Sequence, residues 1–397
     1  MDTKPRDAVI ISAVRTPTGN FLGSLSSFTA PQLGAMVINE AVNRASIDPK
    51  EVQEVIMGQV LQGGCGQAPG RQAAIGGGIP PEAGAMTINK VCGSGLKAVE
   101  LAAQAIRLGD LDVIVAGGME SMSNAPYVLH GARKGFKFGD QKLKDGMILD
   151  GLWDSFNDFH MGMAAELTAE KSKLTREELD RYAYDSQMKA VKAIEGGKFK
   201  EEILSVEIPQ RKGEPIIFDT DETPRANTKL ERLGKLRPAF KKDGMLTAGN
   251  SPGLSDGAAA VVVMAREKAE KLGVKPMAII RGYATGGTEP KWLFYSPVVA
   301  VKKLMAKLKM TIGDFDLIEA NEAFSAQALA DGKELGWDWD RVNVNGGAIA
   351  LGHPIGASGT RVLVTLLYAL ADRSKKVGLA TLCLGGGNAV AMCVELL

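Results

Sequence analysis

Two cysteines and one histidine stand in sequence settings suited to covalent chemistry. Cys92 lies in the segment 89–95, where a strand-like run gives way to a helical one. A helix N-terminus stabilises a thiolate through its unpaired N–H groups and the positive end of its dipole, so we expect a lowered pKa and a nucleophilic thiol. The ordinary alternative is a buried, inert cysteine. The position of Cys92 directly before a helix favours the nucleophile.

His353 is one of only three histidines and is flanked by glycines within the segment 346–359. An ordinary loop histidine caps a helix, whereas glycines on both sides let the backbone approach a ligand closely. We therefore expect His353 to be the general base that a nucleophilic thiol needs. His130 begins a charged stretch and is expected in a solvated loop.

Cys383 and Asn321 both stand at the ends of expected strands. Cys383 closes its strand ahead of three glycines, and Asn321 comes just after the expected strand 316–318. Because ligands bind at strand ends near a switch point between α/β units, we expect Cys383 to share one site with Cys92 and the Asn321 amide to orient a water. A core cysteine and a helix cap are the alternatives. No metal site is expected, since no Cys-x-x-Cys spacing or fourth ligand accompanies the Cys, His, Cys set.

The elements that position these residues alternate between strand and helix. Apolar runs that end in glycines, 113–118 and 382–387, predict buried strands. The segment 96–106 has apolar residues at helix spacing, and 362–370 is apolar all round, as is typical of a helix buried between layers. The alternation predicts an α/β fold.

An internal repeat divides the chain. Ile47 and Ile312 stand in similar segments, and Ser94 and Ser358 open similar helices at nearly the same separation. Two copies of one α/β unit are expected to face each other across a pseudo-twofold axis. The strand 113–118 finds its partner only at 256–264, so we expect an inserted segment that carries specificity. The expected domains are residues 1–119 with 250–276, the inserted loop domain 120–249, and residues 277–397.

Composition excludes several classes of protein. The 397 residues are 45% apolar and carry a net charge of +1, which favours two or three globular domains over a disordered or fibrous chain. With a net charge near zero, the protein has no overall positive field that would attract nucleic acid or an anionic membrane. An anionic ligand must therefore bind at a local basic patch. With no apolar signal core, no membrane-length apolar run and only four scattered cysteines, we expect a reduced, cytoplasmic protein.

Four segments together, 89–97, 321–324, 346–359 and 383–387, resemble the motifs of the thiolase family over nearly the whole chain, particularly its acetoacetyl-CoA-forming members. The resemblance implies a five-layered α-β-α-β-α fold built from two pseudo-repeated halves with an inserted loop domain, and a homotetramer. It also implies the Claisen condensation of two acetyl-CoA to acetoacetyl-CoA and CoA, and the reverse thiolysis. Coenzyme A is then substrate and product, with no tightly bound cofactor.

The same resemblance implies a role for each reactive group. Cys92 is acetylated, His353 activates it, and Cys383 removes a proton from the second acetyl-CoA. One oxyanion is bound by His353 with a water held by Asn321, and the other by the N–H groups of Cys92 and Gly385. Met161 narrows the acyl pocket, and residues 131–144 form a tetramerisation loop. The residues expected to contact coenzyme A are Leu152, His160, Met161, Arg225, Ala248, Gly249, Ala323 and Phe324.

Two departures and several alternatives accompany this interpretation. Pro252 stands where many relatives have a serine that bonds the pantetheine arm, and 293–297 replaces a common Met-Gly-x-Gly-Pro segment.

A degradative 3-ketoacyl-CoA thiolase of broader chain length would use the same residues. A β-ketoacyl synthase would have a second histidine in place of Asn321, a non-catalytic acyl-CoA binder would lack the reactive groups, and a Cys/His hydrolase would not need Cys383.

Overall fold

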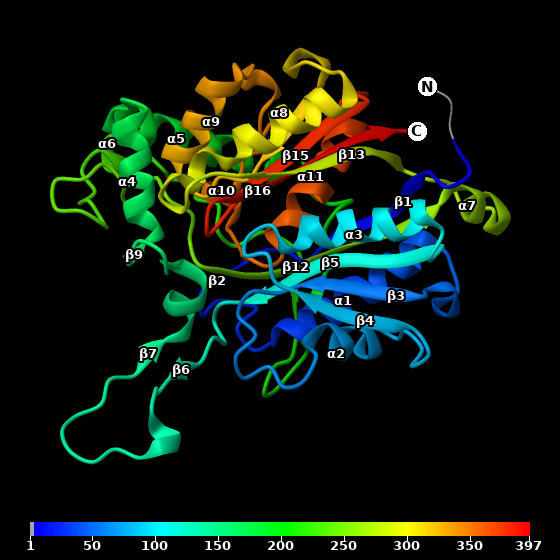
Figure 1. Ribbon diagram of the computed structural model, residues 1–397, viewed down its shortest axis with the longest axis horizontal. Helices are drawn as coiled ribbons and strands as arrows, with labels where there is room; N and C mark the ends of the chain where they lie inside the picture. The colour runs from blue at the N-terminus through cyan, green and yellow to red at the C-terminus, as the bar shows by residue number, and fades with distance from the viewer. Residues whose placement is uncertain (1–3) are drawn as a thin grey trace.

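The computed structural model describes residues 4–397, and its core consists of two halves with the same order of strands (Figure 1). The elements of the first half are β1 (Ala8–Arg15), β2 (Gly19–Asn20), α1 (Ala30–Ala45), β3 (Glu54–Gly58), α2 (Pro69–Gly76), β4 (Gly84–Ile88), α3 (Ser94–Leu108), β5 (Val113–Ser121), β12 (Ser255–Ala265) and α7 (Arg266–Leu272). The expected partner strand of β5 is therefore found far downstream, as β12.

The second half repeats this arrangement. Its elements are β13 (Ala278–Gly287), α8 (Ser296–Leu308), β14 (Leu317–Ala320), α9 (Ser325–Leu335), α10 (Ala348–Leu351), α11 (Ser358–Asp372), β15 (Val377–Leu384) and β16 (Asn388–Leu396). Strands follow the order β14-β15-β16-β13-β1-β12-β5-β3-β4. Around the antiparallel β1–β13 contact, β16 corresponds to β12, β15 to β5 and β14 to β3. The expected α/β fold is confirmed.

The two halves meet at a short seam. Only Val9↔Ile279 and Ile10↔Ala278 pair across β1 and β13. Between the two curved sheet halves lie α3 and α11, which pack on each other, while α1 and α2 cover one outer face and α8 the other (Figure 1). These are the five layers of the expected fold. Apolar side chains fill both interlayer spaces, and burial of such chains contributes about 1.5–3 kcal/mol each.

Glycines allow α3 and α11 to approach at their first turns. A Cβ on Gly95 would lie 2.6 Å from Thr360 Oγ1, and one on Gly359 would lie 2.4 Å from the Leu96 backbone nitrogen. Both distances are shorter than a side chain tolerates. The starts of the two helices are therefore held directly against each other, which brings together the residues that precede them.

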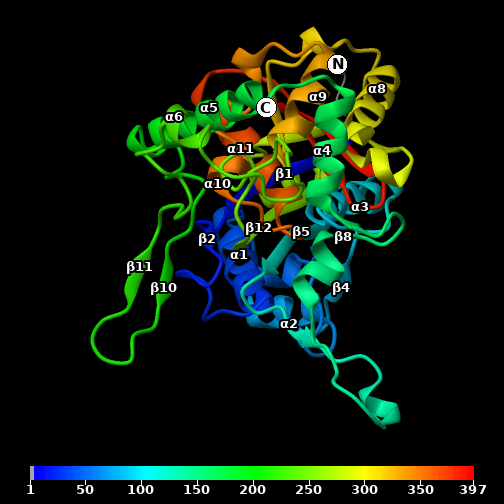
Figure 2. The same cartoon turned by 90° about the vertical axis from the view of Figure 1, so that its left-hand side faces the viewer.

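Between β5 and β12 the chain forms the inserted segment. Its elements are β6 (Tyr127–Val128), β7 (Lys144–Asp145), β8 (Trp153–Asp154), β9 (Phe159–His160), α4 (Met161–Lys171), α5 (Arg176–Glu195), β10 (Val206–Ile208), β11 (Ile216–Phe218) and α6 (Leu230–Leu233). Two arms project from it, one carrying β6 and β7 and the other β10 and β11 (Figure 2). No helix among residues 4–397 is long and apolar enough to cross a bilayer.

A buried ionic cluster ties the inserted segment to the core. Arg15 on β1 pairs with Glu202 at 2.6 Å and with Asp221 at 2.7 Å, and all three side chains are fully buried. Asp221 also accepts a hydrogen bond from the Thr18 backbone. Because removing one partner of a buried pair leaves an uncompensated charge, this cluster fixes the chain just ahead of Arg225.

Short 3₁₀ and π turns complete the secondary structure. The 3₁₀ turns are Pro49–Glu51, Ala132–Lys134, Pro290–Tyr295, Ile312–Asp314 and Trp339–Arg341, and a π-helical turn spans Ile148–Leu152. Pro49–Glu51 and Ile312–Asp314 precede β3 and β14, respectively, so the repeat extends to these turns. The similarity between the segments around Ile47 and Ile312 reflects this shared structure.

Candidate active site

The three reactive side chains line one cavity of about 460 Å³ between the core and the inserted segment. Cys92 precedes α3, His353 precedes α11, and Cys383 belongs to β15. The first comes from one half of the repeat and the other two from the second half. The close packing of α3 on α11 thus places a thiol beside the histidine loop of the opposite half, as the repeat predicted.

Cys92 follows a residue with unusual backbone geometry. Val91 has φ +47°, a left-handed conformation that a β-branched side chain rarely adopts. The Val91 N–H donates to Asn89 Oδ1 at 2.9 Å, and the Val91 carbonyl accepts from Ser94 Oγ at 2.6 Å. These two bonds hold the strained turn, which sets the direction of the Cys92 N–H and thiol.

The prediction of a lowered pKa for Cys92 is wrong for this structure. Burial against the cavity walls raises the pKa of the thiol to about 12. The backbone N–H groups of Cys92 and Gly385 act in the opposite direction, and the nearby charge of Glu120 adds to the rise. The sequence argument considered only the helix terminus, whereas desolvation by the inserted segment is the larger effect. Cys92 is therefore a neutral thiol at rest.

The hydrogen bonds of His353 determine its tautomer. Ser358 Oγ donates to the Pro354 carbonyl at 2.9 Å, so it accepts from His353 Nδ1 at 2.6 Å. Nδ1 therefore carries the proton, and Nε2 is the unprotonated nitrogen. Burial, with the charge of Arg361, lowers the pKa of His353 to about 3. The imidazole is neutral at physiological pH and is available as a base.

Asn321 and Cys383 complete the polar part of the site. Asn321 Nδ2 lies 3.4 Å from His353 Nε2, and its Oδ1 is buried without a hydrogen-bond partner among the described residues. Asn321 does not itself line the cavity. Burial, with the neighbouring Cys92, raises the pKa of the Cys383 thiol well above its usual value. A Cβ at Gly385 would lie 3.2 Å from Val91, so glycine keeps this approach to the thiol open.

Most of the residues expected to contact coenzyme A lie on the same cavity. Those that line it are Leu152, His160, Met161, Arg225, Ala248, Ala323 and Phe324. His160 caps α4 and stacks on Phe240 with ring centroids 5.0 Å apart. Gly249 does not line the cavity, because it packs against Leu233 and Leu236. Pro252 and Leu293 line it, so both departures from the family pattern border the site.

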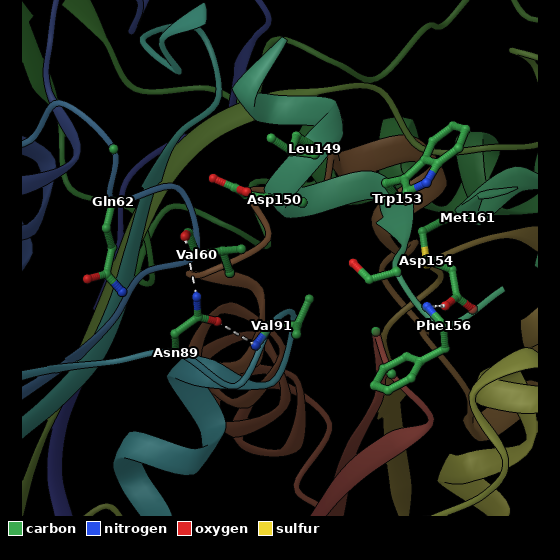
Figure 3. Close-up of a pocket in the computed structure, with 15 residues that line it drawn as sticks. Val60, Gln62, Asn89, Val91, Leu149, Asp150, Trp153, Asp154, Phe156 and Met161 are labelled. Carbon is green, nitrogen blue, oxygen red and sulfur yellow. Dashed lines mark hydrogen bonds between the residues drawn. The ribbon is translucent and has the colours of Figure 1, made fainter. Parts of the chain in front are cut away.

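Met161 separates the main cavity from a second cavity of about 450 Å³. Figure 3 shows this neighbouring space, with Gln62 and Asn89 on one side and Trp153 and Phe156 on the other. Val91, Gly151 and Gly385 also border both cavities. The side chain of Met161 therefore forms part of the wall between the main cavity and the second cavity.

Sequence analysis did not identify Ser358 or Glu120 as functional residues. Ser358 was noted only as the start of a helix, and its bond to His353 depends on how the intervening loop folds. Glu120 lies in the buried strand β5. A carboxylate is unusual in such a strand, and this was the one feature of the sequence that could have pointed to Glu120. No three His, Cys, Asp or Glu side chains within residues 4–397 converge in a way that could hold a metal ion.

Comparison with known proteins gives a consistent result. Residues 8–267 match the thiolase N-terminal domain and residues 274–396 the thiolase C-terminal domain. The chain is 59% identical to an acetyl-CoA acetyltransferase of Pseudomonas aeruginosa, over 98% of each chain, and 56% identical to one of Cupriavidus necator, over 98% of this chain and 99% of that one. The crystal structure of the Bacillus anthracis acetyl-CoA acetyltransferase superposes with a TM-score of 0.97 at 42% identity, covering 98% of this chain and 99% of that chain.

Proposed function

The chain belongs to the thiolase family, and from this premise we propose that it is an acetyl-CoA C-acetyltransferase. It condenses two acetyl-CoA into acetoacetyl-CoA and CoA and catalyses the reverse thiolysis. The observation that carries the proposal is the single cavity lined by Cys92, His353 and Cys383, with Nε2 of His353 unprotonated. A nucleophile and two further proton-transferring groups are what this reaction requires.

In the first half-reaction, Cys92 becomes a thioester. His353 Nε2 takes the thiol proton as the sulfur attacks the carbonyl carbon of acetyl-CoA. Because burial disfavours a free thiolate, we expect the proton to leave during attack rather than before it. The N–H groups of Cys92 and Gly385 face the sulfur and supply donors to the developing oxyanion. Collapse of the intermediate releases CoA, which takes the proton back from His353 Nε2 as it leaves.

In the second half-reaction, a carbanion forms and attacks that thioester. His353 Nε2 takes the proton of the Cys383 thiol, and the resulting thiolate removes a proton from the methyl group of a second acetyl-CoA, so that negative charge passes to the thioester oxygen of this substrate. The protonated His353 and a water bound to Asn321 stabilise this oxygen. The buried Asn321 Oδ1, which has no partner among the described residues, supports such a water, since buried polar atoms need one. Attack on acetyl-Cys92 gives acetoacetyl-CoA, and the departing Cys92 thiolate takes its proton from His353.

The experiment that tests this function supplies the purified protein with acetyl-CoA alone, or with acetoacetyl-CoA and CoA. We expect acetoacetyl-CoA in the first case and acetyl-CoA in the second, each identified by mass spectrometry. Failure to interconvert these compounds in either direction would contradict the proposed function. A ladder of 3-ketoacyl-CoA lengths in the thiolysis assay separates it from a degradative thiolase of broader range.

The wall formed by Met161 predicts a preference for short acyl groups. We expect Met161→Ala to join the two cavities and to raise kcat/KM for 3-ketohexanoyl-CoA about tenfold relative to acetoacetyl-CoA. Two additional methylenes gain about 1.6 kcal/mol when buried, at about 0.8 kcal/mol each. Met163→Ala is the matched control, because Met163 lies on the same helix but borders neither cavity. Equal chain-length profiles for the two variants would contradict this role of Met161.

Arg225 is proposed to contact the charged part of coenzyme A. It lines the cavity, its side chain is exposed, and no carboxylate within residues 4–397 pairs with it. We expect Arg225→Ala to raise KM for acetyl-CoA about tenfold or more, equivalent to about 1.4 kcal/mol, with a smaller effect at high salt. Steady-state kinetics at two salt concentrations measure both effects, and an unchanged KM would place the nucleotide elsewhere.

Pro252 provides a contrasting test of the pantetheine contact. Serine at this position restores one hydrogen bond of about 0.5–1.5 kcal/mol but loosens the turn by about 0.4–1 kcal/mol. Because the two effects nearly cancel, we expect Pro252→Ser to change KM by less than about tenfold. A hundredfold change would show that the pantetheine arm lies differently in the cavity.

We also propose that the chain forms a homotetramer through the arm that carries β6 and β7. Tyr127, Phe136, Phe138 and Leu143 expose apolar side chains there, and Phe138 is 100% exposed. An isolated chain rarely leaves such a surface uncovered. The free edge of β4 offers a second contact between chains. The residue divisions 1–119 with 250–276, 120–249 and 277–397 remain our proposed domains.

Light scattering tests this assembly. We expect a mass of four chains for the natural sequence and a smaller assembly for Phe138→Asp, because a charge at the tip of the arm opposes its burial. Leu108→Asp places a charge on another exposed leucine, 78% exposed at the end of α3, and serves as the control. A Phe138→Asp variant that keeps the mass of four chains would contradict the role of the arm.

A further inference from the structure

Glu120 on β5 is a fully buried carboxylate that binds two separate loops. Its Oε2 accepts from the Val60 N–H at 3.0 Å and from the Gly356 N–H at 2.9 Å, and its Oε1 accepts from the Leu61 N–H at 3.2 Å. A carboxylate in this position costs free energy unless its oxygens are bonded, and here three donors converge on it. The proposed reaction assigns Glu120 no role.

One of these loops leads to the nucleophile. The Val60 carbonyl accepts from Asn89 Nδ2 at 3.4 Å, and Asn89 Oδ1 holds the Val91 N–H at 2.9 Å. Figure 3 shows Asn89 between Val60 and Val91, with both bonds drawn. Val91 is the strained residue directly before Cys92. A continuous chain of bonds therefore runs from Glu120 to the turn that directs the Cys92 thiol.

The other loop leads to the base. Gly356 lies between His353 and Ser358, whose side chains bond each other. The loop packs so closely that a Cβ on Gly356 would lie 2.7 Å from Glu120 Oε2 and 2.9 Å from the Met119 carbonyl oxygen. Ile355 borders the cavity and packs with Val60, Leu61 and Cys92. Both loops are thus fixed to one carboxylate beneath the cavity floor.

We propose that Glu120 is a positioning residue that sets the relative placement of Cys92 and His353 by holding the Val60–Leu61 turn and Gly356 in one frame. This inference rests on the proposed roles of Cys92 and His353. The ionised carboxylate is the better acceptor for all three bonds, because protonation removes its charge and puts an O–H donor among three N–H donors. We expect the bonds that hold the Val60–Leu61 turn and Gly356 in this frame to weaken when Glu120 is protonated.

The surroundings of Glu120 place that protonation near neutral pH. Burial raises the pKa of Glu120 to about 7, although the three backbone N–H groups lower it. The charge of Asp256 on β12 adds to the rise. Cys92 is the other titrating group that its charge reaches, and Cys92 keeps its proton throughout the neutral range. His353, in the same loop as Gly356, stays neutral down to about pH 3. A raised pKa means that the ionised form, and with it the frame, is lost as pH falls through about 7.

The test is single-turnover acetylation of Cys92 by acetyl-CoA between pH 6 and 9, followed by quenching and mass spectrometry. In the natural sequence we expect the rate to fall as pH decreases through about 7. Glu120→Gln should be slower by about 10- to 100-fold at pH 8, since a bond to a charged group contributes about 1.5–3 kcal/mol, and should show no fall near pH 7. Asp256→Asn, which removes a like charge, should move the fall to lower pH.

Glu166→Gln is a matched comparison. Glu166 is also buried and accepts from the backbone N–H groups of Met245 and Leu246, in the segment that leads to Ala248 on the cavity. We expect it to raise KM for acetyl-CoA and to leave the pH dependence of acetylation in place. Thermal melting of each variant checks that it is folded.

The outcomes separate this inference from the proposed function. A Glu120→Gln rate within about threefold of the natural protein at every pH would overturn the positioning role, as would a fall that stays at the same pH in Asp256→Asn. If the natural protein is not acetylated at Cys92 at all, the proposed function itself has failed.

Discussion

Replacing Cys92 by alanine is expected to lower the rate of condensation by about 10⁴-fold or more, because removal of the nucleophile leaves only binding and the oxyanion donors. Brief exposure to acetyl-CoA should add one acetyl group to the Cys92 peptide of the natural protein and none to the variant. Mass spectrometry of the digested chain measures both results. Acetylation of another peptide in active protein would contradict the assignment.

The raised pKa of Cys92 adds a second expectation for the same residue. Without substrate, iodoacetamide should label Cys92 slowly at pH 7, and the rate should keep rising beyond pH 9, since only the thiolate reacts. Cys65→Ala is the control for loss of a cysteine, because Cys65 lies outside the cavity. It should retain both acetylation of Cys92 and condensation.

Cys383→Ala is expected to separate the two half-reactions. Condensation should fall by about 10²- to 10⁴-fold, the usual contribution of a general acid or base, while Cys92 is still acetylated. Burial raises the pKa of the Cys383 thiol, so its thiolate, once formed, is a strong base toward a methyl proton. Acetylated Cys92 cannot ionise, so no Cys92 thiolate can form beside Cys383 and disfavour the Cys383 thiolate.

Exchange of deuterium into the methyl group of acetyl-CoA measures the proton transfer directly. The natural protein should catalyse this exchange in D₂O, and Cys383→Ala should not, even where acetyl-Cys92 accumulates. Condensation by the variant at an undiminished rate would contradict the separate role of Cys383. Loss of acetylation together with condensation would show that Cys383 acts in the first step as well.

The arrangement of the fold could be predicted because the repeat shows in the hydrophobic and glycine patterns of short segments. The apolar helix at 362–370 and the glycine-ended strands lie where their periodicity placed them, and β12 was identified as the distant partner of β5. These features depend on residues close in sequence. The strand pairs of the two arms were not predicted, although residues 131–144 were expected to form a loop, because a short strand pair has too few residues to give a periodic signal.

The site was predictable as a set of residues but not in its electrostatics. Cys92, His353 and Cys383 converge as expected, whereas the pKa of Cys92 rises because walls from distant segments exclude water. Gly249 faces Leu236 rather than the cavity, which spacing alone does not reveal. The function of Glu120 depends on N–H groups at positions 60, 61 and 356, and no local pattern connects these positions to residue 120.

The seam between the halves has a consequence for how such a chain can change over generations. Two residue pairs of β1 and β13 and the glycine contacts of α3 and α11 act together with the bonds of Glu120 to set the nucleophile of one half against the base of the other. The two halves carry different reactive groups, so neither can change its position by itself. A substitution that shifts one copy by an ångström is harmless to that copy's own packing and yet separates atoms that must exchange a proton. Compensating changes should therefore appear in pairs, one on each side of this seam.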